Sequence, residues 1–174
     1  MLMLHWPVTN HYEETWKEMI RLRDQGICRD LGVANCHEHH IKRLYECSGE
    51  YPLVNQVELH PLFTQVSLKN YCEVHGIQVM AYSPTARHDD RLFNPPLLME
   101  IANKYGKSPT QIVLKWHIQN RVIPVIRSLN YAHQSEDIDI FDFEISESDM
   151  KLINGLNINA RIRYDPDNCD FRCL

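Results

Sequence analysis

The 174-residue chain is 44% hydrophobic and 24% charged, which suits a globular domain with a sizeable core. Its net charge of −5 provides no basic surface for nucleic acid. Its longest apolar runs are too short to cross a bilayer. We therefore expect neither a nucleic-acid partner nor a membrane partner.

The cysteines indicate a reducing compartment. They stand at positions 28, 36, 47, 72, 169 and 173, without a CxxC pair or zinc-ligand spacing. Scattered thiols of this kind are most simply reduced and packed as small apolar side chains. A pairing of Cys169 with Cys173 is the alternative, which nothing in the sequence requires. The apolar N-terminus lacks the charged segment and cleavage site of a signal peptide, so we expect a cytoplasmic protein.

Strand-like and helix-like patterns alternate along the chain. The strand patterns are rich in apolar and β-branched residues and cover residues 2–6, 31–35, 54–61, 77–82 and 122–126. The helical patterns cover the stretch from Asn10 to Gly26, the stretch around 41–45, residues 65–75 and 97–105, the stretch after Ser108, and residues 131–138 and 149–156. Asn10 and Glu13 have the spacing of a capping box, and residues 89–96 are expected to form a loop.

Five strands that alternate with helices indicate right-handed βαβ units and a parallel sheet, without a composition break between domains. A complete eight-unit barrel takes roughly 250 residues, or about 31 per unit, so the chain has the length of about 5.6 units. The pattern alone fits an open doubly wound sheet as well as part of a barrel.

Residues 54–61 form the most informative strand pattern. Side chains alternate between the two faces of a strand, so Gln56, Glu58 and His60 lie on one face. Helical patterns on both sides predict a sheet covered on both faces, where a polar row is costly unless something binds it. We interpret this row as the first sign of a ligand site.

Polar side chains stand at the C-terminal end of every predicted strand, where parallel α/β proteins bind their ligands. These residues are His5 and Trp6, Asn35, Gln56 and Glu58, Tyr82 and Ser83, and Arg127 and Ser128. Each alone can be a core residue, a helix cap or a surface ion pair, and only the set points to a site. The chain has no GxGxxG or Walker motif, so a bound nucleotide would be held in another way.

Two segments have metal-like composition. Cys36-His37-Glu38-His39-His40 lies at a helix start, but no distal ligand matches it, and a solvated helix terminus is the simpler interpretation. Asp165-Pro166-Asp167-Asn168 is like a fragment of a calcium loop and lacks the full ligand pattern. We expect no metal site.

A set of motifs closely resembles the aldo-keto reductase family, in the family's order and spacing and over nearly the whole chain. The motifs are Leu4-His5-Trp6-Pro7, Leu31-Gly32-Val33-Ala34-Asn35, residues 54–61, Ala81-Tyr82-Ser83-Pro84, residues 102–109 and Ile140-Phe141-Asp142-Phe143. The resemblance implies a (β/α)8 TIM barrel and NADP-dependent reduction of aldehydes and ketones, with a small carbonyl compound as substrate. It matches this chain to strands four to eight plus a tail at residues 157–174, an incomplete barrel in one domain over residues 1–174.

The resemblance also implies roles at the nicotinamide end. His5 matches the active-site histidine that orients the substrate carbonyl, and Trp6 matches a wall of the substrate pocket. Asn35 and Gln56 match the side chains that hold the nicotinamide carboxamide, a task that suits amide donors and acceptors. Tyr82 matches the aromatic residue that stacks on the nicotinamide ring.

At the phosphate end, Ser83 matches a pyrophosphate contact, and Arg127 and Ser128 match the pair that binds the adenosine 2′-phosphate. Glu136 and Asp137 match positions near the adenine.

At three positions the chain departs from the residue that is usual in the family. Ala34 stands where the family usually has serine, which removes a hydrogen bond worth roughly 0.5–1.5 kcal/mol. His133 replaces a usual arginine near the 2′-phosphate, and Asp137 replaces a usual asparagine. Because both changes weaken discrimination for NADP, use of NAD as well is our hypothesis.

The family's catalytic tyrosine, lysine and aspartate match no residue of this chain, whose first strand resembles strand four. Tyr82 has its own match and Tyr12 lies in a helical pattern, so no tyrosine takes the role of proton donor. We expect negligible reductase activity from the isolated chain. The alternative is a non-catalytic nucleotide-binding or interaction protein, with self-association through open sheet edges.

Overall fold

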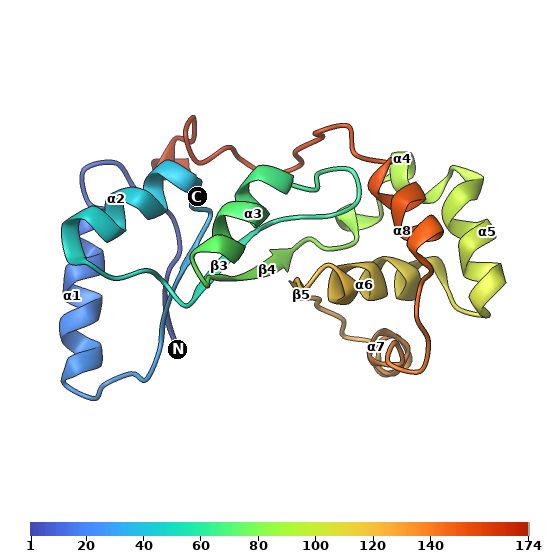
Figure 1. Cartoon of the computed structure of the whole chain (residues 1–174), viewed down its shortest axis with the longest axis horizontal. Coiled ribbons are helices and arrows are strands. Elements are labelled where there is room, and N and C mark those ends of the chain that lie inside the picture. The colour runs from blue at the N-terminus through green and yellow to red at the C-terminus, as the bar shows by residue number, and fades with distance from the viewer. Residues whose placement is uncertain (174) are drawn as a thin grey trace. The chain divides into compact units, whose positions relative to one another are not determined.

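A computed structural model describes residues 1–173 (Figure 1). The side chain of Cys173 lies outside this description, and so does the alternative pairing of Cys169 with Cys173. Among the described residues, no helix is both long enough and apolar enough to cross a membrane.

One sheet contains five strands hydrogen-bonded in chain order. The strands are β1 (Leu2–Leu4), β2 (Leu31–Ala34), β3 (Val54–Glu58), β4 (Gln78–Tyr82) and β5 (Ile123–Pro124). β1 pairs with β2 and β2 pairs with β3 in parallel, with Leu4 opposite Val33 and Ala34 opposite Gln56. The predicted α/β class with a parallel five-stranded sheet is confirmed.

The chain divides into two compact units, each discontinuous in sequence. The first unit consists of Met1–Val57, Val66–Met80 and the residues from Arg163 on. The second unit consists of Glu58–Gln65 and Ala81–Ile162.

The first unit contains β1 and β2 together with several helices. These helices are α1 (Tyr12–Asp24), α2 (Glu38–Ser48), α3 (Val66–Val74) and the short 3-10 helix η2 (Phe171–Cys173). Trp16 of α1 is buried, and its indole Nε1 donates to Ser48 Oγ of α2 at 3.2 Å, so α1 and α2 pack together (Figure 1). Cys36 and Cys72 are fully buried, and burial raises the pKa of Cys72 to about 11, so both pack as small apolar side chains.

The second unit is built around a buried helix. Its helices are η1 (Ala86–His88), α4 (Asp90–Phe93), α5 (Pro96–Tyr105), α6 (Pro109–Gln119), α7 (Tyr131–Ile138) and α8 (Glu147–Asn154). Ser108 caps α6 and forms a capping box with Gln111, which confirms the predicted start of this helix. Trp116 of α6 is fully buried, and its Nε1 donates to Asn154 Oδ1 of α8 at 2.8 Å.

The secondary structure differs from the sequence expectations at three places. Asn10 does not cap α1, because its backbone is left-handed at φ 66° and His11 takes the N-cap position without a side-chain bond. The expected loop at residues 89–96 contains α4, whose first turn is capped by Asp89. The last strand pattern shrinks to two residues, since Pro124 has no N–H to donate to a ladder.

The polar row of β3 is largely satisfied inside the protein. Glu58 and His60 have fully buried side chains, and His60 Nε2 donates to Glu58 Oε1 at 3.1 Å. The same oxygen accepts the backbone N–H of Ile162 at 2.6 Å. Our interpretation of the row as ligand-facing is therefore wrong for Glu58 and His60, because these two side chains are buried and bind each other. Only Gln56 keeps a half-buried side chain.

We expect Glu58→Ala to lower the free energy of unfolding by about 3 kcal/mol, because removing one partner of a buried pair leaves the other unpaired. Urea denaturation monitored by tryptophan fluorescence measures this change. The matched control is Glu100→Ala on the exposed surface of α5, which should change stability by less than about 0.5 kcal/mol. Equal effects of the two substitutions would contradict the structural role of the pair.

Candidate functional site

The first unit brings together residues from the ends of its first three strands. The side chain of Asn35, after β2, donates from Nδ2 to the backbone carbonyl of His5, after β1, at 2.9 Å. The backbone N–H of Asn35 donates to the carbonyl of Gln56 in β3, also at 2.9 Å. His5, Asn35 and Gln56 are therefore neighbours at the C-terminal ends of these parallel strands, as strand polarity predicts.

The side chains at this edge differ in accessibility. His5 is exposed, and Trp6 and Gln56 are half-buried. Among the described residues, the Gln56 amide has no hydrogen-bond partner, so its donor and acceptor are available to a ligand. The Trp6 ring meets Phe171 edge-on, at 6.2 Å between ring centroids.

Left-handed backbone marks two strand ends. Asn35 has φ 59° after β2, and Ser83 has φ 49° after β4. Asparagine tolerates this region better than most residues, whereas a serine there costs about 1–3 kcal/mol. Such strain persists where surrounding contacts hold it, which is common at ligand sites.

Asn55 is a positioning residue that the sequence analysis did not single out. Its side chain is fully buried, donates from Nδ2 to the carbonyl of Cys36 at 2.8 Å and accepts the Cys36 N–H at 3.4 Å. This clamp fixes the turn that carries Asn35. An amide in the middle of a buried strand requires buried partners, and that requirement is the signal in the sequence.

In the second unit, Tyr82 and Ser83 end β4, and both are half-buried. The remaining predicted residues lie in or near a pocket of about 590 Å³ between α6, β5 and α7. Its lining is mostly apolar, with the polar groups Arg127, Ser128, Gln134 and Asp137. His133 and Glu136 lie on the same helix but do not line the pocket.

The segment from Arg127 to the start of α7 has features of an anion site. Arg127 forms no ion pair with any described residue, and α7 begins four residues later, at Tyr131. Asn130 caps α7 by accepting the Ala132 N–H at 2.9 Å, and its own N–H donates to Ser128 Oγ at 3.1 Å. A guanidinium beside a helix N-terminus favours a phosphate.

Asp137 contributes a half-buried carboxyl to the pocket. Burial raises the pKa of its carboxyl, and the charge of Glu136 raises it further.

The histidines after β2 have a distal partner. Asp167, far along the chain, lies 2.8 Å from His37 Nδ1 and 3.1 Å from His39 Nε2. Burial acts to raise the pKa of Asp167, but the hydrogen bond from His37 and the histidine charges outweigh it and lower that pKa. The premise that no distal ligand matches the histidines is therefore wrong.

Comparison with known proteins identifies the family. The sequence model of the Aldo/keto reductase family matches residues 1–88 and 89–158. The chain belongs to the aldo/keto reductase family. This membership confirms the resemblance carried by the sequence motifs.

Similar proteins support the assignment over nearly the whole chain. An uncharacterized oxidoreductase of Bacillus subtilis, YtbE, is 39% identical over 98% of this chain and 60% of the relative. The methylglyoxal reductase DkgA of Escherichia coli is 36% identical over 96% of this chain and 62% of the relative. The chain thus spans about 60% of the length of these curated aldo/keto reductases.

Solved structures agree with the fold. A variant of Gox0644 in complex with NADPH has a TM-score of 0.92 at 32% identity, covering 97% of this chain and 63% of that one. An aldo-keto reductase of Bombyx mori in complex with NADP has a TM-score of 0.86 at 35% identity, covering 95% and 59%.

We expect Asn55→Ala to lower the free energy of unfolding by about 1–3 kcal/mol, because it leaves the buried Cys36 N–H and carbonyl without partners. Faster hydrogen exchange at the Cys36 amide should accompany the loss. Asn70→Ala, on the exposed surface of α3, is the matched control and should alter neither property. An Asn55 variant as protected as the wild type at Cys36 would rule out the clamp.

Proposed function

We propose that this chain forms the cofactor-binding part of an NADP(H)-dependent reductase of aldehydes and ketones. In this proposal residues 1–174 are one domain, an incomplete (β/α)8 barrel of five βα units that correspond to strands four to eight. The observation that carries the proposal is the Arg127 guanidinium, which forms no ion pair with a described residue and lines a pocket of about 590 Å³ four residues before α7. NADP(H) in the Gox0644 variant and in the Bombyx mori enzyme supports the choice of cofactor.

The pocket suits the adenosine end of the cofactor. Arg127 and the Ser128 hydroxyl are proposed to bind the 2′-phosphate, since a guanidinium pairs with phosphate through charge-assisted hydrogen bonds. The apolar lining, such as Ile126 and Ile138, suits the flat face of adenine. His133, Glu136 and Asp137 are proposed to border this end. His133 and Asp137 stand where the family usually has an arginine and an asparagine, so NAD is an alternative cofactor.

At the nicotinamide end, Asn35 and Gln56 are proposed to hold the carboxamide. Ala34, opposite Gln56 in the sheet and buried, supplies no hydroxyl to help them. Tyr82 is proposed to stack on the nicotinamide ring and Ser83 to contact the pyrophosphate.

The chemistry needs a hydride and a proton. The cofactor, when bound, supplies the hydride. His5 is exposed at the sheet edge and is proposed to donate a hydrogen bond to the substrate carbonyl oxygen, with Trp6 as a wall of the pocket. No tyrosine of these 174 residues matches the family's proton donor, and we propose that the chain alone is not catalytically competent.

The names of relatives indicate the substrate class. Methylglyoxal reductase and glyoxal reductase are among them, so a small reactive carbonyl compound is the proposed substrate. The cysteine pattern supports a cytoplasmic location. The second candidate function is non-catalytic nucleotide binding, with self-association through sheet edges, and the unmatched proton donor favours it.

We expect the chain to bind NADPH, and Arg127→Ala to weaken binding by about tenfold or more, because a lost charged hydrogen bond costs about 1.5–3 kcal/mol. Quenching of protein fluorescence during NADPH titration measures this. Arg29→Ala is the matched control, since its side chain is 92% exposed in the other unit. Binding of NADPH by Arg127→Ala as tight as by the wild type would exclude this site.

NADH tests the hypothesis of dual use in the same titration. If His133 and Asp137 relax discrimination, NADH should bind within about tenfold of NADPH, a difference below about 1.4 kcal/mol. A larger preference for NADPH would reject dual use while leaving the cofactor site intact.

Purified 174-residue chain supplied with methylglyoxal and NADPH should show no turnover above background, because no positioned acid protonates the developing alkoxide. NADPH oxidation followed by absorbance measures this. Binding without turnover agrees with the proposed cofactor-binding part, and robust turnover would show that a group in these residues acts as the acid.

A further inference from the structure

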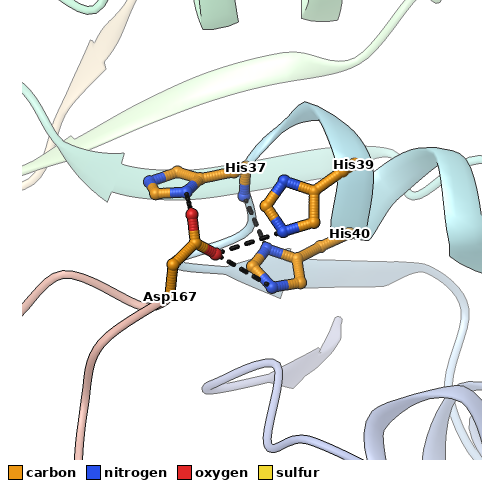
Figure 2. A group of neighbouring side chains, drawn as sticks. All are labelled: His37, His39, His40 and Asp167. Carbon is orange, nitrogen blue, oxygen red and sulfur yellow. Dashed lines mark hydrogen bonds and ion pairs between the residues drawn. The ribbon is translucent and has the colours of Figure 1, made fainter.

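Three histidines at the start of α2 surround one carboxylate from the C-terminal segment of the same unit (Figure 2). Asp167 Oδ2 lies 2.8 Å from His37 Nδ1. The other oxygen, Oδ1, lies 3.1 Å from His39 Nε2 and 3.4 Å from His40 Nε2. None of these four side chains belongs to the set proposed to bind cofactor or substrate, so their role depends on what they hold in place.

The chain around Asp167 forms a β-turn that presents the carboxylate. The N–H of Asn168 donates to the carbonyl of Asp165 at 3.0 Å, and the N–H of Asp167 donates to Asp165 Oδ1, also at 3.0 Å. Aspartate at the first position and proline at the second are favoured in such turns, and Pro166 is buried. The segment compared with a calcium loop in the sequence analysis is therefore a hydrogen-bonded turn, here called the Asp167 turn (residues 165–168).

The capping box of α2 holds two of the histidines in place. His40 Nδ1 accepts the backbone N–H of His37 at 3.1 Å, and the His37 side chain accepts the backbone N–H of His40. Burial lowers the pKa of His40 to about 4, so at neutral pH its proton is on Nε2, which faces Asp167. The Tyr12 ring of α1 meets His40 edge-on, with 5.6 Å between ring centroids. The two capping rings therefore form a fixed support for the carboxylate.

The ordinary alternative is a surface ion pair that contributes nothing to the position of the segment, as many exposed ion pairs do. Two features distinguish Asp167 from such a pair. Its carboxylate faces three imidazoles at a helix N-terminus, which itself attracts an anion. The His40 side chain is only 9% exposed, and its Nε2–H needs an acceptor, which Asp167 supplies.

The Asp167 turn is close in sequence to a contact at the proposed substrate pocket. Phe171, four residues after Asp167, begins η2 and meets Trp6 edge-on, with 6.2 Å between ring centroids. Ordering one residue of a chain end costs as much as a single ring contact returns, so this contact does not order the segment alone. Four residues of chain span at most about 14 Å, so an anchored Asp167 keeps Phe171 near Trp6.

We propose that Asp167 is a positioning residue that acts through Phe171 on the wall of the substrate pocket. Its carboxylate fastens the Asp167 turn to the start of α2, and the fastened turn places the Phe171 ring against Trp6. The inference rests on the proposed function for the role of Trp6 as a pocket wall. The link from Asp167 to Phe171 and Trp6 depends only on contacts within the first unit.

The indole N–H signals in two-dimensional NMR spectra test this link, because the chain has three tryptophans and each gives one signal. Phe171→Leu defines the shift of the Trp6 signal when the ring contact is lost. Asp167→Ala should move the Trp6 signal in the same direction, while the signals of the buried Trp16 and Trp116 stay in place.

Asp24→Ala is the matched control, because it removes a carboxylate that is 62% exposed at the end of α1 in the same unit. This control should leave all three indole signals unchanged.

His39→Gln tests the link from the other side. His39 is 62% exposed and outside the capping box, so this variant should fold even if Asp167→Ala does not. It should move the Trp6 signal in the same direction, and the double variant should move it no further than Asp167→Ala alone, because the two residues act in one contact. A Trp6 signal that neither variant moves, or additive shifts in the double variant, would overturn the proposal.

These spectra need no cofactor, so their outcome is separate from that of the NADPH titration. A chain that fails to bind NADPH would overturn the proposed function, and a Trp6 signal that moves in Asp167→Ala would still support the positioning role.

Discussion

The clamp between the Asn55 amide and the backbone of Cys36 controls the exit from β2. Asn55 satisfies both the N–H and the carbonyl of Cys36 inside the core, where either group would be costly if left alone. The residue before Cys36 turns into the left-handed region and binds the end of β1, and the residue after it begins the first turn of α2. The proposed carboxamide site and the start of α2 therefore both depend on one buried side chain.

A second buried polar group performs the same task in the other unit. Glu58 accepts the N–H of Ile162 and the ring N–H of His60, and the backbone of Leu62 accepts from Ile158 and Ala160. Polar side chains at these strand ends thus replace the partners that regular secondary structure would have provided. The groups left for a ligand are those without a partner among the described residues, above all the Gln56 amide and the Arg127 guanidinium.

The sequence predicted what depends on local period and strand polarity. Alternating apolar runs identified all five strands, and the rule that ligands bind at strand ends selected Asn35 and Arg127 as candidates. The sequence did not predict which side chains of distant segments contact each other. His37 and Asp167 are 130 residues apart, and the period of β3 could not distinguish a ligand-facing Glu58 from one that pairs internally. The sequence also did not predict the N-cap of α1 at His11 or the short length of β5, which depend on the conformations of single residues.

The discontinuity of the first unit constrains how this polypeptide can fold during synthesis. Asp167, the partner of the α2 histidines, is made only after α2 and the whole of the second unit. Holding residues 37 and 167 together also costs the closure entropy of a loop of 130 residues, about 4 kcal/mol by the logarithmic rule. The α2 histidines therefore gain this partner only after the residues between them and Asp167 have been made.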